Sequence, residues 1–247
     1  MKLLAKNNNH RHGGTSMIQF SDFEKKIKVV FKDKKLLKQA FTHRSYINEN
    51  PAASLSHNER LEFLGDAVLE LIVTDFLYKK YPHYDEGELT ALRSALVNAL
   101  IISEIASKIG MNDYLLLSKG EAKDFGKARQ YILANTYEAL VGAMYLDQGY
   151  DTVNKFVAKN LLPKTEEIVN KKLWRDAKSL VQEKAQEFVS ATPAYKVLNE
   201  SGPDHDKHFT VGIYFKTDLI AEGKGKSKQE AEQKAAEAAL KARNWLD

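Results

Sequence analysis

The sequence contains no cysteine, and this absence excludes several kinds of site at once. Without a thiol there is no disulfide, no thiolate zinc site and no cysteine nucleophile. None of the seven histidines belongs to a His-Glu-x-x-His motif, the pattern that binds zinc on a helix. Functional groups must therefore be sought among oxygen and imidazole groups.

Long hydrophobic runs are absent as well. No run approaches the roughly 18 apolar residues of a membrane span, and residues 95–106 are interrupted by Asn98, Ser103 and Glu104. Only positions 3–5 are apolar before the polar N-terminal stretch, too few for a secretory signal. We therefore expect a cytoplasmic protein with no membrane partner.

The chain also has little excess charge of either sign. Its 37 Lys and Arg residues and 33 Asp and Glu residues give a net charge of +4, and residues 173–247 carry 12 of each kind. A nucleic-acid-binding surface must therefore be a local patch, because the chain as a whole has no strong positive field.

What the sequence does have is a set of three carboxylates in an apolar helical run, residues 58–69. Glu59, Glu62 and Asp66 are spaced i, i+3 and i+7, which places them within an arc of about 60° on one helix face. Acids held this close repel one another and are rarely buried unpaired, so a positive group should cover that face. A hard divalent cation with oxygen ligands is the best candidate.

A second polar pair, Asn135 and Glu138, lies at i and i+3 in another apolar helical run, residues 132–141. Placed against the first helix, this pair would complete an oxygen cage together with Glu62 and Asp66. Mg²⁺ in such a cage keeps several waters and binds phosphate directly, and it lowers the pKa of a bound water. Phosphodiester hydrolysis is the reaction that this chemistry suits best.

Two of the acids also have a purely structural interpretation. Glu59 follows Ser56 by three residues, which is the spacing of a capping box at a helix start. Glu86 lies in a polar turn, where a solvated loop or a helix cap is an alternative to a functional role.

Glu62 and Asp66 have a structural alternative too, a buried salt bridge to Arg60 or Arg93. A di-iron carboxylate bundle is excluded, because it needs Glu-x-x-His pairs and the chain has none.

The pattern of apolar residues changes along the chain. From about residue 20 to 170 they recur every three or four positions, which predicts an all-α region. Its expected helices cover residues 36–41, 56–69, 89–109, 130–146, 152–160 and 164–172. After residue 173 a helix at 177–188, strands at 195–198, 209–215 and 219–221, and a helix at 227–242 predict a small α+β module of order α-β-β-β-α.

Together these residues resemble bacterial ribonuclease III. Residues 58–69 match the signature of that family nearly letter for letter, residues 37–46, 85–87 and 132–147 resemble its other blocks, and the C-terminal module resembles its double-stranded RNA-binding domain. The resemblance implies a disordered tail at 1–16, an all-α endonuclease domain at 17–162, a linker at 163–175 and a double-stranded RNA-binding domain at 176–245.

The resemblance also implies an activity. Members of the family are homodimeric, Mg²⁺-dependent endonucleases without an organic cofactor, and Mn²⁺ can replace Mg²⁺ in them. They cut both strands of duplex RNA, including ribosomal RNA precursors and mRNA, and leave 5′-phosphates and short 3′ overhangs.

Residue by residue, the resemblance makes Glu62, Asp66, Asn135 and Glu138 metal ligands. Asp66 and Glu138 would be catalytic, with Glu138 the most critical. Asn135 stands where the family commonly has Asp, so the cage lacks one negative charge. We therefore expect retained activity with weaker metal affinity.

Three further positions match residues of known role in the family. Glu59 and Glu86 match acidic positions that organise the cleavage site and its RNA contacts, and Phe63 matches an aromatic residue that inserts into the partner subunit.

Residues of the C-terminal module match the RNA-binding parts of the family. They are Gln182 and Glu183 in its first helix, His205 in a loop, and Lys224, Lys226 and Lys228 before its last helix. A helix N-terminus beside three lysines can hold phosphates, although a solvated turn has the same composition. Gln229 and Glu232 depart from the pattern, because the family often has lysines there.

Two other functions remain open at this point. A catalytically silent RNA-binding dimer would keep the fold and the C-terminal module, and Asn135 is the feature in its favour. A metal phosphohydrolase acting on small nucleotides would explain the acids, but it would leave the C-terminal module without a role.

Overall fold

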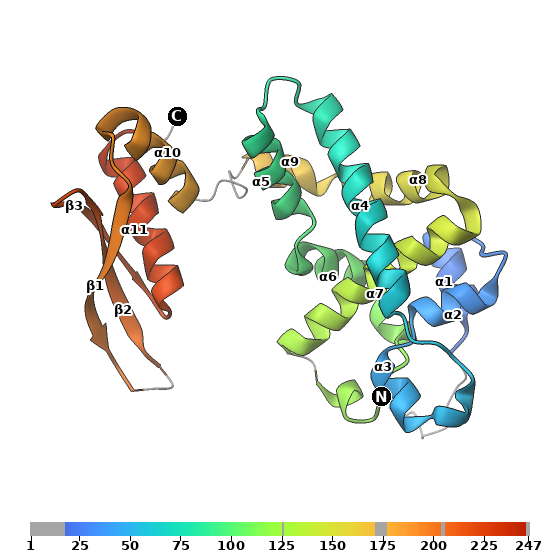
Figure 1. Cartoon of the computed structure of the whole chain (residues 1–247). Helices are drawn as coiled ribbons and strands as arrows, with labels where there is room; N and C mark the ends of the chain where they lie inside the picture. Colours follow the sequence, from blue (N-terminus) through green and yellow to red (C-terminus); the bar gives the residue numbers. More distant parts are fainter. Residues whose placement is uncertain (1–17, 125, 171–176, 204–205, 246–247) are drawn as a thin grey trace, which may run out of the picture. The chain divides into compact units, whose positions relative to one another are not determined.

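The computed structural model describes residues 18–124, 126–170, 177–203 and 206–245. The chain divides into two compact units, residues 1–69 with 99–160 and residues 70–98 with 161–247, and each is described by itself. Figure 1 traces their elements along the chain. The expected tail at 1–16, part of the expected linker and His205 lie outside the described residues.

In the described part of the first unit the regular elements are helices, joined by loops and one isolated bridge between Thr42 and Leu116, as expected for an all-α region. Its α-helices are α1 (Phe20–Ile27), α2 (Lys34–Ala40), α3 (Arg44–Glu49), the beginning of α4 (Glu59–Lys80), α6 (Ala99–Lys108), α7 (Lys127–Gln148) and α8 (Tyr150–Asn160). Short 3-10 helices lie at η1 (Pro51–Ala53), η2 (Met111–Tyr114) and η3 (Glu121–Lys123).

Helix α7 forms the core of this unit. It packs against α2, α6 and α8, and its side chains are buried on nearly all sides between Leu133 and Met144. Such burial explains why its sequence is apolar without a clear polar face. Asn135 is exposed and Glu138 is half-buried, so these two polar residues lie where the helix reaches the surface.

Helix α4 begins at Glu59, directly after the buried Asn58. The carbonyl oxygen of Asn58 accepts hydrogen bonds from the backbone of Leu61 and Glu62, both 2.9 Å long, and its side chain donates to the carbonyl of Ala40 at 3.1 Å. The expected capping box between Ser56 and Glu59 is therefore wrong, because tertiary contacts of Asn58 fix the start of the helix.

The second unit holds the remainder of α4, α5 (Glu86–Leu96) and α9 (Lys164–Asn170). Helices α5 and α9 are in contact, and Lys80 of α4 forms an ion pair with Glu166 at 3.3 Å. The single helix expected at residues 89–109 is wrong. It is divided into α5 and α6 at Val97 and Asn98, where the Asn98 side chain donates to the carbonyl of Ala95 at 2.8 Å.

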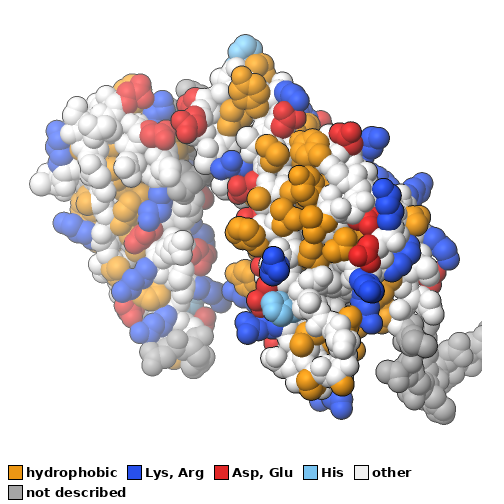
Figure 2. All heavy atoms as spheres, turned by 45° about the vertical axis from the view of Figure 1, so that its right-hand side comes forward, with side chains coloured by type: hydrophobic (Ala, Val, Ile, Leu, Met, Phe, Trp, Pro, Cys, Tyr) orange, Lys and Arg blue, Asp and Glu red, His pale blue; other side chains and the backbone are white. Residues whose placement is uncertain are grey.

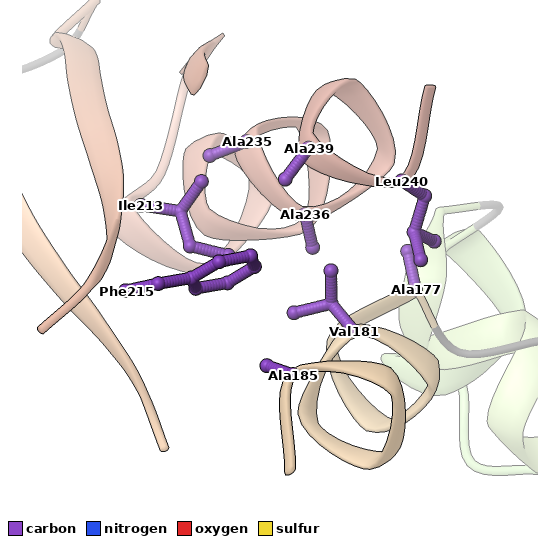
Figure 3. Packing of buried hydrophobic residues seen from close by; sticks show 9 residues of the cluster. All are labelled: Ala177, Val181, Ala185, Ile213, Phe215, Ala235, Ala236, Ala239 and Leu240. Carbon is purple, nitrogen blue, oxygen red and sulfur yellow. The ribbon is translucent and has the colours of Figure 1, made fainter. Parts of the chain in front are cut away.

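The C-terminal module has the predicted order, with α10 (Ala177–Val189), β1 (Pro193–Ser201), β2 (His208–Phe215), β3 (Asp218–Gly225) and α11 (Lys228–Ala242). The three strands form an antiparallel sheet in the order β1-β2-β3. Figure 3 shows its core, in which Val181 of α10 and Phe215 of β2 point toward the small side chains of α11. The predicted α+β module is confirmed.

Strand β3 lies unusually close to α11. A Cβ atom on Gly223 would overlap the backbone of Ala235 and Ala231, and one on Gly225 would lie 2.7 Å from the backbone nitrogen of Ala231. The third strand, predicted at residues 219–221, therefore extends to Gly225, since the two glycines allow it to approach the helix.

Among the described residues, no single helix is long and apolar enough to cross a membrane. Helices α5 and α6 together meet the criteria of length and composition as a bent pair.

Candidate functional site

The predicted acids are brought together by a close crossing of α4 and α7. A Cβ atom on Gly65 would overlap the backbone carbonyl of Glu138, and one on Gly142 would overlap the backbone carbonyl of Leu61. Only glycine permits the two backbones to touch in this way. The crossing therefore places the acidic face of α4 beside the turn of α7 that carries Asn135 and Glu138.

Glu62 is the central acid of this group. Burial raises the pKa of its carboxyl group above the usual value, and the neighbouring carboxylates of Glu59 and Asp66 raise it further. A hydrogen bond from the Asn135 side chain lowers this pKa, with an effect smaller than that of Glu59 but larger than that of Asp66. The site therefore holds several carboxylates at close range.

The structural alternative of a buried salt bridge is excluded. Within the described part of the chain, neither Glu62 nor Asp66 forms an ion pair with a basic residue. Arg60 is exposed, and Arg93 instead donates to the hydroxyl of Thr74 at 3.2 Å. The same described ranges contain no group of three acidic or histidine side chains that could hold a metal ion as they stand.

Glu59 lies at the edge of the group and is partly neutralised. Its carboxylate is 3.3 Å from the Arg44 guanidinium and 3.7 Å from Nδ1 of His57. It borders a pocket of about 280 Å³. The lining residues are His43, Asn58, Glu59, Glu62, Glu121, Ala128, Tyr131, Ile132 and Asn135.

The remaining predicted acids lie outside the pocket wall. Asp66 is exposed on α4, one turn beyond Glu62, and Glu138 is half-buried on α7, one turn beyond Asn135. Glu86 belongs to the second unit, where it is exposed in the first turn of α5. The cap of α5 is formed by Asp85 and Glu88, so Glu86 is not the capping residue.

Two pocket residues were not singled out from the sequence. His43 follows Thr42, which is held between Leu116 and Asn58: His43 N donates to the carbonyl of Leu116 at 3.0 Å, and Asn58 N donates to that of Thr42 at 2.9 Å. Glu121 lies in η3, which the buried Arg129 fixes by donating to the carbonyl of Glu121 at 2.7 Å. Of these two residues only His43 could have been found from the sequence, since it lies in the stretch 37–46 that resembles a block of the ribonuclease III family.

An apolar side chain is exposed near the acids. Phe63 lies between Glu62 and Asp66 in the sequence of α4, and it is 82% exposed. Figure 2 shows further hydrophobic side chains, in orange, on the surface of the helical part of the chain. A phenylalanine this exposed is typical of a surface that binds another protein.

The predicted RNA-binding residues of the C-terminal module that are described, Gln182, Glu183, Lys224, Lys226 and Lys228, are all exposed. Lys224 lies at the end of β3, and the Lys228 ammonium lies 5.7 Å from the centre of the Phe209 ring. Lys226 lies 3.4 Å from the carboxylate of Asp206. Its hydrogen bond to Asp206 holds the pKa of that carboxyl group below the usual value.

Comparison with known proteins decides which class of site this is. A family described as ribonuclease-III-like matches residues 33–165, and the double-stranded RNA binding motif matches residues 177–242. The chain is 44% identical over 222 residues to Ribonuclease 3 of Bacillus velezensis, which covers 90% of this chain and 89% of that protein. The chain belongs to the ribonuclease III family.

Other ribonuclease III sequences and structures agree. Ribonuclease 3 of Borreliella burgdorferi is 46% identical over 224 residues, covering 91% of each protein. The solved nuclease domain of ribonuclease III from Campylobacter jejuni has a TM-score of 0.54 at 36% identity and covers 59% of this chain and 99% of that chain. The chain is therefore an endoribonuclease of double-stranded RNA with a helical nuclease domain and a double-stranded RNA-binding domain.

Proposed function

We propose that the acids at the crossing of α4 and α7 form the cleavage site, and that they bind Mg²⁺, or Mn²⁺ in its place. The ligands would be Glu62, Asp66, Asn135 and Glu138. The carrying observation is the close helix crossing at Gly65 and Gly142, which brings the acidic face of α4 beside the turn of α7 that carries Asn135 and Glu138. The raised pKa of Glu62, which reflects burial and the nearby carboxylates of Glu59 and Asp66, agrees with it. Carboxylate and amide oxygens are the donors that a hard cation prefers, so these residues fit the metal.

When bound, the metal supplies an activated water and balances negative charge on the phosphoryl oxygens. The residues of the chain then have distinct tasks. Asp66 and Glu138, as metal ligands, would position the activated water and the phosphate that it attacks. The side-chain amide of Asn135 donates a hydrogen bond to Glu62. This bond favours the charged form of the carboxylate, which is the form that binds a metal. Glu59, which forms an ion pair with Arg44, would help to orient the RNA backbone. The family resemblance gives Glu86 a role in RNA contacts as well.

We also propose the products, targets and assembly. Membership of the family supports 5′-phosphate ends with short 3′ overhangs, on ribosomal RNA precursors and mRNA in the cytoplasm. The exposed Phe63 supports a homodimer with the α4 helices at its interface. A related structure is described as containing a region involved in dimer formation of its nuclease domain.

The proposed RNA-binding surface of the C-terminal module uses Lys224, Lys226 and Lys228, with Gln182 and Glu183 on α10. Such modules recognise the shape and the 2′-hydroxyl groups of a duplex across about 16 base pairs, largely independently of the base sequence.

Exchange of Asn135 for Asp tests the metal site. The new carboxylate restores a negative charge, so we expect the Mg²⁺ concentration for half-maximal cleavage to fall by about tenfold, which corresponds to roughly 1.4 kcal/mol. The measurement is the initial cleavage rate of an end-labelled perfect RNA duplex as Mg²⁺ is varied, with a chelator at the first point.

In the same titration, the wild-type protein should be inactive with the chelator. Cleavage in the chelator would contradict the proposed metal dependence. An unchanged Mg²⁺ requirement in Asn135→Asp would remove residue 135 from the ligand set.

Exchange of Phe63 for Asp tests the homodimer. A charge at an apolar interface must be desolvated, so we expect the variant to sediment as a monomer and to lose cleavage while its helical content is retained. Analytical ultracentrifugation measures the mass in solution. Val30, which lies between α1 and α2 and is 71% exposed, provides the matched control Val30→Asp. Dissociation of both variants to monomers would argue against a role of Phe63 in the dimer.

A further inference from the structure

The pocket beside the proposed metal ligands contains two polar groups that the proposed reaction does not use. They are the Nε2 atom of His43 and the carboxylate of Glu121, which lie close enough for Glu121 to raise the pKa of the histidine. In the described ranges of the chain, neither group has a hydrogen-bond partner. They are therefore available to a ligand that enters the pocket.

The hydrogen bonds of His43 fix which of its ring nitrogens carries the proton. Its Nδ1 accepts from the backbone nitrogen of Ser45 at 3.3 Å and lies 2.8 Å from the Ser45 hydroxyl. That hydroxyl oxygen also accepts from Ser118 N at 3.1 Å. Because the backbone N–H of Ser45 can only donate, Nδ1 of His43 is the acceptor of that bond. Because Nδ1 is an acceptor, the ring is neutral and Nε2 is the donor.

The electrostatic surroundings agree with a neutral ring. Burial lowers the pKa of His43, while the carboxylates of Glu121 and Glu59 have the opposite effect and Arg44 and His57 add to the lowering. His43 therefore presents a single N–H group to the pocket at neutral pH.

A neutral N–H donor beside a carboxylate acceptor favours a ligand group that can accept one hydrogen bond and donate another. A phosphate is only an acceptor, so it cannot donate to the Glu121 carboxylate, and the charge of that carboxylate would repel it. A hydroxyl group can accept from the histidine and donate to the carboxylate at the same time. The ribose 2′-hydroxyl is the group of this kind that distinguishes RNA from DNA along the backbone.

We propose that His43 and Glu121 together bind one ribose 2′-hydroxyl of the RNA strand in the pocket and so contribute to the selection of RNA over DNA at the cleavage site. The Nε2–H group of His43 donates a hydrogen bond to the hydroxyl oxygen, and the hydroxyl group donates a hydrogen bond to the Glu121 carboxylate. This inference rests on the proposed function, because it places the strand next to the proposed metal ligands.

The test uses a set of duplexes in which a single 2′-hydroxyl near the cleavage site is replaced by hydrogen, one position at a time. For the wild-type protein, we expect one position to lower the cleavage rate by about tenfold, the usual effect of one lost hydrogen bond. In His43→Asn the all-RNA duplex should be cut about tenfold more slowly, and the deoxy substitution at that position should cause no further loss.

Two variants separate the lost contact from a damaged fold. Asn at position 43 retains an oxygen that can accept from Ser45 N, so α3 keeps its cap, but it does not reach as far as Nε2. Gln at position 43 places an N–H group near the original Nε2, so His43→Gln should retain sensitivity to the deoxy substitution. Glu121→Ala should lose that sensitivity at the same position as His43→Asn.

The outcomes distinguish this inference from the proposed function. Cleavage of the all-RNA duplex without a sensitive position, or undiminished sensitivity in His43→Asn, overturns the inference alone. No cleavage by the wild-type protein overturns the proposed function. The dissociation constants of the same duplexes then decide the inference. One deoxy duplex should bind the wild-type protein more weakly than the all-RNA duplex does. The His43→Asn variant should bind these two duplexes equally well.

Discussion

Replacing Glu138 by Gln should lower the rate of duplex RNA cleavage by about 10³-fold, because a proposed metal ligand would lose its charge while keeping its shape. Binding of the duplex should change little, since the C-terminal module is untouched. The measurement is a pair of assays on one protein preparation, with cleavage followed on a denaturing gel and binding followed by gel shift in Ca²⁺.

A matched control separates the site from a general loss of charge. Glu104→Gln makes the same chemical change on an exposed residue of α6, and it should cleave at the wild-type rate. Normal cleavage by Glu138→Gln would remove Glu138 from the catalytic group. Equal loss of binding and cleavage would instead indicate that the exchange disturbs the fold.

Replacing Gly65 by Ala should be the most destabilising small substitution in the nuclease domain. Its methyl group would overlap the backbone carbonyl of Glu138, which cannot rotate away as a side chain can. We expect a loss of about 3 kcal/mol in the free energy of unfolding, equivalent to roughly 6–12 °C in Tm, together with a large loss of activity. Thermal unfolding followed by circular dichroism measures the first effect.

Another helical glycine serves as the control. At Gly87, in the exposed first turn of α5, the nearest heavy atom to an added Cβ is the Asp85 side chain at 3.3 Å. Gly87→Ala should leave Tm unchanged or raise it slightly, because alanine favours a helix by about 1 kcal/mol relative to glycine. A Gly65→Ala protein as stable as Gly87→Ala would show that α4 and α7 can separate without cost.

Most helices of the nuclease domain and the common face of the three acids on α4 were predictable from the sequence, because both depend on local spacing. That these acids bind a metal remains a prediction. The i, i+3 and i+7 positions of Glu59, Glu62 and Asp66 survive any packing of α4, so their common face was correctly expected. The apolar stretch of α7 likewise predicted a buried helix, and only its ends, now Lys127 and Gln148, were placed too far inward.

Features that depend on distant residues were missed or wrong. The start of α4 is set by the bond from Asn58 to Ala40, and the spacing of Ser56 and Glu59 carries no trace of it. His43 and Glu121 meet because Thr42 pairs with Leu116, a single bridge that has no sequence pattern. Such contacts require knowledge of the tertiary fold, which periodicity does not give.

The crossing at Gly65 and Gly142 also limits how this protein can evolve. A clash with a neighbouring side chain can be relieved by a second mutation that makes that side chain smaller. Here the obstacle to each glycine is the main chain of the opposite helix, which every amino acid possesses. No substitution elsewhere can make room for a side chain at either position, so lineages that retain this helix crossing have no compensating mutation with which to escape glycine.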